Sequence, residues 1–174
     1  MNFYRCLICG EVYMGDGVPS HCPFCGAKAK YLVTADQWVD ENIGLGKLSD
    51  VSRKNLEAAL QLEANNAPFY KDASARAKSI ELQGVFKYLF KIEREHADVI
   101  QKILKVEAPQ PEPGKEVAGD DEMENLRAAH EREKYATKFY ADSAKQAVEP
   151  RVKKVFLALA EIESDHVKLE GSRL

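Results

Sequence analysis

The sequence predicts an all-α four-helix bundle preceded by a small β module that binds a metal ion through cysteines. Three observations support this fold class. All four cysteines lie between positions 6 and 25, a helical 3.6-residue periodicity begins near residue 51, and the helical part repeats itself after 70 residues. A chain of 174 residues has room for one bundle and one small module.

Composition excludes several other classes of protein. The hydrophobic fraction of 45% and the charged fraction of 30% are typical of globular domains. A net charge of −3 argues against nucleic acid as a partner, since such binding needs excess Lys and Arg. No run of 18 apolar residues is present to cross a membrane, and the start MNFYRC lacks the pattern of an export signal. We therefore expect a cytoplasmic protein.

The predicted N-terminal module, residues 1–35, contains two CxxCG motifs, CLICG and CPFCG. Four thiols in a reducing compartment indicate a metal site rather than disulfides, and this spacing predicts tetrahedral coordination. The glycine after each second cysteine allows a tight turn. Short β-type runs at 3–5 and 31–34 complete a zinc-ribbon-like module. The ligands would be Cys6, Cys9, Cys22 and Cys25, and the sequence leaves both zinc and a single iron ion possible.

Residues 36–50 are predicted to form a linker, and residues 51–174 the bundle. The periodicity places helices near 51–78, 81–105, 121–147 and 150–170. Ser49 or Asp50 is a candidate N-cap, and Pro150 suits a first helical turn. Pro68 is expected to kink or bulge the first helix. The Pro- and Gly-rich segment 109–120 predicts one long crossover between the second and third helices.

The internal repeat identifies the candidate ligands of a second metal centre. Apolar identities such as Leu56/Leu126 and Phe86/Phe156 are expected of any duplicated core. Glutamate and histidine identities are not, and each half offers one Glu followed 30 residues later by Glu-x-x-His. A single Glu-x-x-His motif occurs by chance on exposed helices, but two copies in register with two further Glu argue against chance. The candidate ligands are Glu63, Glu93, His96, Glu133, Glu163 and His166.

Four inward carboxylates would repel one another without cations, whereas two divalent ions neutralise them. One Glu from each of two helices with Glu-x-x-His from the other two is the ligand set of ferritin-like di-iron proteins. Iron is expected, and manganese remains possible. Tyr70 and Tyr140 each follow a candidate ligand Glu by seven residues. They are either core aromatics or phenols that hydrogen-bond a ligand carboxylate.

These motifs resemble rubrerythrin, with the rubredoxin-like module first rather than last. The resemblance rests on CLICG, CPFCG, Glu63 with Tyr70, EREH at 93–96, Glu133 with Tyr140, and ESDH at 163–166. It implies reduction of hydrogen peroxide to water in defence against oxidative stress. It also implies electron entry through an Fe(Cys)4 site, fed by a reductase that uses a nicotinamide cofactor or by a rubredoxin.

The resemblance further implies a homodimer, with a domain-swapped assembly as one of its forms. A helix of about 26 residues is about 39 Å long, so a module that feeds metals at mid-bundle must dock on the side of a bundle. The linker at 36–50 would permit docking on a neighbouring chain, and we expect electrons to cross between chains.

One position departs from the family pattern. Typical rubrerythrins carry a further Glu three residues after the third-helix ligand, where this chain has Ala136. Glu131 and Glu57 do not have the helical phase to replace it. Two alternatives to peroxide reduction therefore stay open, a ferroxidase or iron-handling protein and an oxygen-reducing di-iron oxidase. A zinc ribbon on a helical scaffold without turnover is a third.

Overall fold

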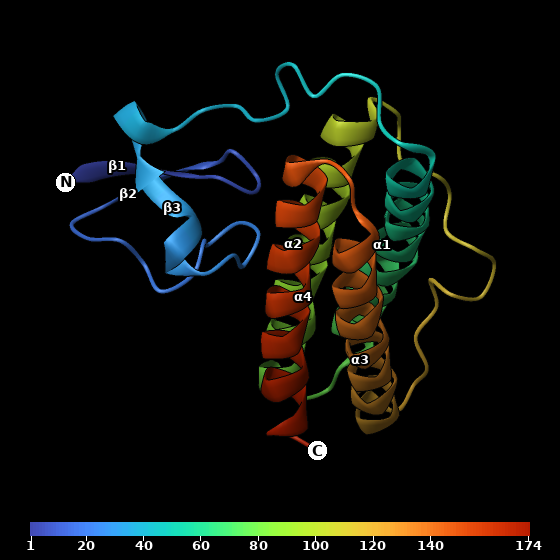
Figure 1. The fold of residues 1–174 in the computed structure, drawn as a ribbon. Helices are drawn as coiled ribbons and strands as arrows, with labels where there is room; N and C mark the ends of the chain where they lie inside the picture. The colour runs from blue at the N-terminus through green and yellow to red at the C-terminus, as the bar shows by residue number, and fades with distance from the viewer.

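Four long helices run alongside one another in the computed structural model, which describes residues 1–174, and a small sheet lies against their flank (Figure 1). The predicted fold class is confirmed. The helices are α1 Asp50–Arg76, α2 Ile80–Leu104, α3 Glu122–Gln146 and α4 Pro150–Gly171. No helix is both long enough and apolar enough to span a bilayer.

Polar caps fix where the helices begin. The side chain of Ser49 accepts from the Ser52 amide, that of Ser79 starts α2, and that of Asp121 starts α3, while Pro150 occupies the first turn of α4. Each observed end lies within two residues of the predicted one. Helix α1 continues through Pro68 as one uninterrupted element.

The helices pack as two antiparallel pairs, α1 with α2 and α3 with α4, and α1 also contacts α3. The long connection from α2 to α3 runs along the outside of the bundle, beside α1, from one end to the other, as Figure 1 shows in yellow. Matching apolar positions of the sequence repeat are completely buried in both halves, for example Leu56 with Leu126 and Phe86 with Phe156. The duplicated sequence therefore folds into duplicated helix pairs.

The N-terminal module is an antiparallel sheet of three short strands, β1 Asn2–Cys6, β2 Val12–Gly15 and β3 Leu32–Thr34, in the order β2-β1-β3. Strand β2 was not predicted, because it has only four residues and none of them is fully buried. Gly10 and Gly26 have φ angles of 85° and 79°, a region that glycine enters without strain. Both CxxCG motifs thus use their glycine for the expected turn.

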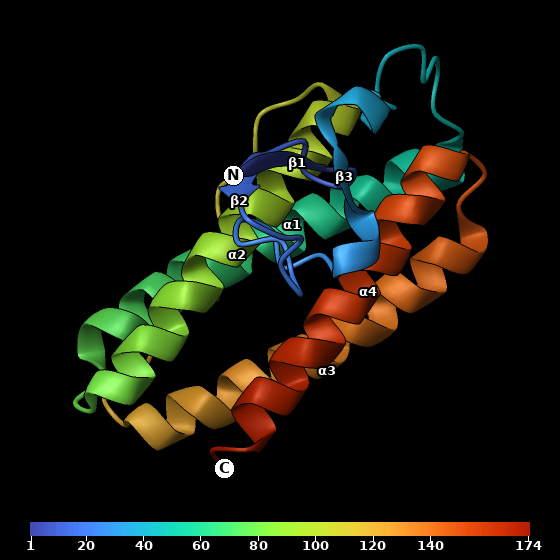
Figure 2. The ribbon, with the colours of Figure 1, turned by 90° about the vertical axis from the view of Figure 1, so that its left-hand side faces the viewer.

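The module lies on the flank formed by α2 and α4 of its own bundle (Figures 1 and 2). One continuous apolar cluster includes Ile8 and Ala27 of the module together with Ile92 and Ile162 of the bundle. One of the two hydrophobic clusters of the protein therefore extends across both parts of the chain, while the other lies within the bundle.

Polar contacts also fix this position. Arg151 of α4 donates to the carbonyls of Leu7 at 2.6 Å and Ile8 at 2.7 Å. Within the predicted linker, Trp38 donates to the Cys6 carbonyl at 3.2 Å and Asn42 accepts from Arg151 at 2.9 Å. The linker is thus held along its own chain in this single-chain structure, and docking on a neighbouring chain stays a prediction.

Candidate metal centres

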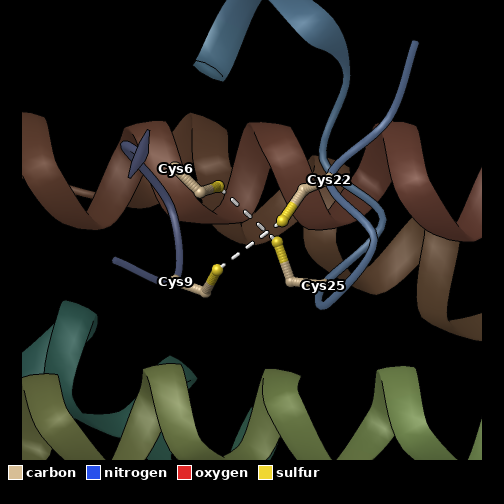
Figure 3. A group of neighbouring side chains, drawn as sticks. All are labelled: Cys6, Cys9, Cys22 and Cys25. Carbon is tan, nitrogen blue, oxygen red and sulfur yellow. Dashed lines mark hydrogen bonds between the residues drawn. The ribbon is translucent and has the colours of Figure 1, made fainter. Parts of the chain in front are cut away.

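The four cysteine side chains point toward a common centre, on the flank formed by α4 and α2 (Figure 3). The Cys6 and Cys25 sulfurs are 3.8 Å apart, and those of Cys9 and Cys22 are 3.9 Å apart. These separations are far too long for disulfides, whose S–S bond is about 2.05 Å. A tetrahedral ion with metal–sulfur bonds of about 2.3 Å has S···S edges of about 3.8 Å, so the geometry fits one bound ion.

The surroundings of the sulfurs favour a bound cation. All four cysteines are buried, and the Ile8 amide donates toward the Cys6 sulfur at 3.4 Å. Hydrogen bonds from Cys22 and then Cys25 hold the pKa of Cys6 well below its usual range. A cysteine in its thiolate form is the form that ligates metal. Hydrogen bonds from Cys22 raise the pKa of both Cys9 and Cys25, so it is the burial and the sulfur separations of the four-cysteine cluster that fit a metal site.

The six candidate ligands of the bundle meet in its interior, and none has more than 3% of its surface exposed. They come from all four helices, with Glu63 on α1, Glu93 and His96 on α2, Glu133 on α3, and Glu163 and His166 on α4. Their donor atoms form two overlapping groups, each with all atoms within 4.8 Å of one another. One group contains Glu63 and His96, the other Glu133 and His166, and Glu93 and Glu163 belong to both.

Unpaired atoms at this centre indicate that cations belong there. Both oxygens of Glu93 and one oxygen each of Glu63, Glu133 and Glu163 are buried without a hydrogen-bond partner. Buried polar groups are normally paired, and unpaired carboxylates are the most costly exception. Two shared carboxylates, two terminal ones and two imidazoles match the donor set of a centre for two ions. The residues fit such a centre.

Burial and mutual repulsion perturb the protonation of the carboxylates. Burial, and then the Glu163 charge, raises the pKa of Glu133 to about 7. Burial would also raise the pKa of Glu163, but the charges of His96 and His166 outweigh it and hold that pKa below its usual range. Burial lowers the pKa of His166, and hydrogen bonds to Glu133 and Glu163 more than reverse this. In the absence of metal, protons bound to Glu133 and His166 therefore reduce the repulsion among the buried carboxylates.

The two tyrosines bond to ligand carboxylates, but each across the bundle rather than on its own helix. The Tyr70 hydroxyl of α1 donates to Glu133 of α3, and the Tyr140 hydroxyl of α3 donates to Glu63 of α1. Both phenol rings are completely buried. Each hydroxyl therefore satisfies one oxygen of a candidate ligand and fixes its orientation.

A single hydrogen bond joins the two candidate centres. His96 Nε2 donates to the carbonyl oxygen of Cys25 at 3.0 Å. With its proton on Nε2, the imidazole of His96 carries its free lone pair on Nδ1. The Nδ1 atom lies 3.1 Å from a Glu163 oxygen and 3.4 Å from a Glu93 oxygen. A candidate ligand of one centre is thus bonded to the backbone of a candidate ligand of the other.

Sequence reasoning missed two kinds of residue. Arg151 holds the module, and its sequence position carries no signal of that role. Glu170 is fully buried one helical turn after His166, with His130 beside it. Its signal was its spacing of four residues from a candidate ligand histidine. Ala136, where the family pattern has a carboxylate, is buried, with 1% of its surface exposed.

Comparisons with known proteins agree with this architecture. A family model described as Rubrerythrin matches residues 54–169, and one described as the rubredoxin-like domain of rubrerythrin matches residues 4–32. Reverse rubrerythrin-1 from Clostridium acetobutylicum is 30% identical over 116 residues, which are 60% of this chain and 62% of that protein. The match thus spans less than two thirds of that relative.

Two solved structures share the fold. A hypothetical protein from Pyrococcus furiosus has a TM-score of 0.62 at 21% identity, over 70% of this chain and 87% of that one. A two-domain protein from Anabaena variabilis, with DJ-1/ThiJ/PfpI-like and ferritin-like domains, has a TM-score of 0.65 at 14% identity, over 72% of this chain and 40% of that one. With bundle and module both matched, the chain belongs to the rubrerythrin family, in the variant order that places the rubredoxin-like domain before the bundle.

Proposed function

We propose that this protein is a non-haem di-iron peroxide reductase that receives electrons through its four-cysteine site. The observation that carries the proposal is the hydrogen bond between His96 and the Cys25 carbonyl. A ferroxidase or an iron store has no need of a second metal site bonded to its di-metal centre. A protein that must return electrons to its di-metal centre after each turnover does need such a second site.

The contacts define a short route for those electrons. It runs from the Cys25 sulfur along that residue's backbone to its carbonyl, across the hydrogen bond to Nε2 of His96, and through the imidazole to Nδ1. The route requires iron in the cysteine site, because zinc has no redox chemistry. An external reductase or a rubredoxin would supply the electrons one at a time.

The reaction is the reduction of one hydrogen peroxide by two electrons and two protons to two water molecules, with cleavage of the O–O bond. When bound, two iron ions in the bundle would provide both electrons at one place. Glu93 and Glu163, which belong to both donor groups, would help to hold both ions, and the Tyr70 and Tyr140 hydroxyls orient the carboxylates of Glu133 and Glu63. The burial of all these groups excludes bulk water.

A small oxidant has a route of approach beside His166. A hollow of about 560 Å³ is lined by His166 and Tyr88 of the bundle and by Gly26 of the module, among others. The Nε2 atom of His166 has no hydrogen-bond partner, in contrast to that of His96. The two imidazoles of the repeat thus have different neighbours, one the module and the other the hollow.

One observation favours a second candidate. Ala136 leaves the centre without the additional α3 carboxylate that the family pattern carries, and the centre is more symmetric as a result. This symmetry favours oxygen as the oxidant, or Fe²⁺ as a substrate. The experiment must therefore compare the oxidants directly.

The test uses Cys9→Ser, which removes one ligand of the electron-entry site. We expect it to abolish steady-state peroxide reduction driven by a reductase, while a chemically pre-reduced bundle still reacts once with peroxide. In the wild type, stopped-flow oxidation of the reduced bundle should be faster with hydrogen peroxide than with dioxygen at equal concentration. Equal steady-state rates in variant and wild type would place electron entry elsewhere, and faster oxidation by dioxygen would favour the second candidate.

A further inference from the structure

One buried carboxylate near the di-metal centre takes no part in the function proposed above. Glu170 of α4 has none of its surface exposed, and neither of its carboxylate oxygens has a hydrogen-bond partner. On a helix, residues 163, 166 and 170 lie on one face, so Glu170 continues the inward stripe of Glu163 and His166. It is about 6 Å along the axis from His166.

Only one basic side chain, a histidine, lies within ion-pair distance of this carboxylate, while the positive charge of His166 also acts on it. His130 Nδ1 of α3 lies 3.8 Å from a Glu170 oxygen, too far for a hydrogen bond, and is itself buried without a partner. No lysine or arginine is paired with Glu170. Two ligands of one ion at bonds of about 2.1 Å are typically about 3 to 4 Å apart, so the observed separation suits two donors to a shared cation.

The internal repeat supplies a natural comparison. The positions that correspond to His130 and Glu170 in the first half are Leu60 and Ile100, and both are buried in the apolar core. The same layer of the bundle can therefore be filled by hydrocarbon. A pair of unpartnered polar side chains at this layer costs stability that an apolar pair does not, which indicates a role other than folding.

We propose that His130 and Glu170 form a third cation position of the bundle, next to the di-metal centre on its His166 side. Imidazole nitrogen with carboxylate oxygen suits a divalent ion such as Fe²⁺, Mn²⁺ or Zn²⁺. The His130 side chain is 21% exposed, so water can complete the coordination and ions can reach the position from solvent. Gly171 leaves the room for the imidazole, because a Cβ there would lie 3.3 Å from the ring.

The test counts bound ions in the full-length protein with its cysteine site filled. After the bundle ions are removed with a chelator, Mn²⁺ is titrated in and its free concentration is read by electron paramagnetic resonance. We expect Glu170→Gln, and His130→Leu with Glu170→Ile, to lose one bound Mn²⁺ per chain relative to the wild type. The double variant copies the apolar pair of the first half, so its metal-free form should melt no lower than the wild type. Glu95→Gln removes a half-buried carboxylate next to His96, also with an unpartnered oxygen, and should lose no ion.

Crystals soaked in Mn²⁺ locate the ion independently of the count. The proposal requires an anomalous peak between His130 Nδ1 and the Glu170 carboxylate, separate from the peaks of the di-metal centre. An unchanged count in both variants, or a Glu170 oxygen bound to the same ion as His166, would overturn it. So would a lower melting temperature of the metal-free double variant, since the pair would then serve to hold α3 and α4 together. None of these outcomes depends on which oxidant the protein reduces.

Discussion

Two tyrosine hydroxyls determine how the terminal carboxylates of the bundle are oriented. Tyr70→Phe removes the bond to Glu133 and leaves another buried oxygen of that ligand unpaired. Loss of such a partner typically weakens metal binding by roughly 10- to 100-fold. We expect this loss in a chelator competition assay for Tyr70→Phe and equally for Tyr140→Phe. Tyr135→Phe, on α3 but 60% exposed, is the matched control and should bind metal as the wild type does.

The pH dependence of stability should reverse when metal binds. In the metal-free protein Glu133 has a pKa of about 7 against an ordinary 4.5, so between these values the folded state holds a proton that the unfolded state has released. Its contribution is complete below pH 4.5 and is lost as the pH rises to 7. The raised pKa of His166 acts in the same direction, and the lowered pKa of Glu163 acts only below 4.5.

The melting temperature of the metal-free protein should therefore fall from pH 5 to pH 7. Bound metal requires deprotonated ligands, so with saturating Mn²⁺ it should rise over the same range. Circular dichroism melts at several pH values give both slopes, and Glu133→Gln should flatten the metal-free one. A metal-free melting temperature that rises from pH 5 to pH 7 would mean that burial and the neighbouring Glu163 do not raise the pKa of Glu133.

At the scale of the residue, sequence patterns predict which side chains gather, because ligand spacing follows from helix geometry. They did not predict partners across the bundle. The sequence indicated that Tyr70 could hydrogen-bond a ligand carboxylate but not which one, and the fold brings its hydroxyl to Glu133 of α3. Likewise Glu170 belongs to no repeated motif; its spacing of four residues from His166 is a sequence signal, but only the structure shows that its carboxylate is buried.

At the scale of the element, the helices and the docking of the module on the side of a bundle were predicted, whereas the contacts that hold the module there were not. Serine and aspartate caps and amphipathic periodicity are local signals, and they placed each helix end within two residues. The position of the module on the bundle depends on contacts between residues distant in sequence, such as Arg151 with Leu7. A close approach of backbone to helix at Gly26 is another such contact, and only a three-dimensional structure reveals it.

Gly26 gives a sharp test of this docking. A Cβ at Gly26 would lie 3.0 Å from Ile162 of α4, whereas one at Gly10, also at positive φ, would lie 3.7 Å from Trp38 within the N-terminal segment. Both alanine variants carry a similar backbone strain, but only Gly26→Ala overpacks the contact with the bundle, at about 1–3 kcal/mol. We expect Gly26→Ala to lower reductase-driven turnover far more than Gly10→Ala, with metal content unchanged in both. Equal turnover in the two variants would contradict docking at this contact.

At the scale of the whole molecule, the question is whether electrons stay within one chain. The length of the linker led us to expect transfer between chains of a homodimer. In the structure, however, Trp38 and Asn42 bind the linker to its own chain, and the module contacts its own α2 and α4. The homodimer stays a prediction from the family resemblance, whereas the contacts of this chain support transfer within each protomer.

A mixing experiment separates the two routes. Cys9→Ser chains lack the electron-entry site and Glu93→Ala chains lack a shared ligand of the bundle centre, so neither is active alone. If electrons travel from Cys25 to His96 of the same chain, mixed dimers made by unfolding and refolding both together contain no complete route and stay inactive. Native mass spectrometry verifies that mixed dimers formed, and refolded wild type gives the yield of active protein. Activity that returns in the mixed dimers would instead require a swapped assembly, in which the module of one chain occupies the α2–α4 flank of its neighbour through the same Arg151 contacts.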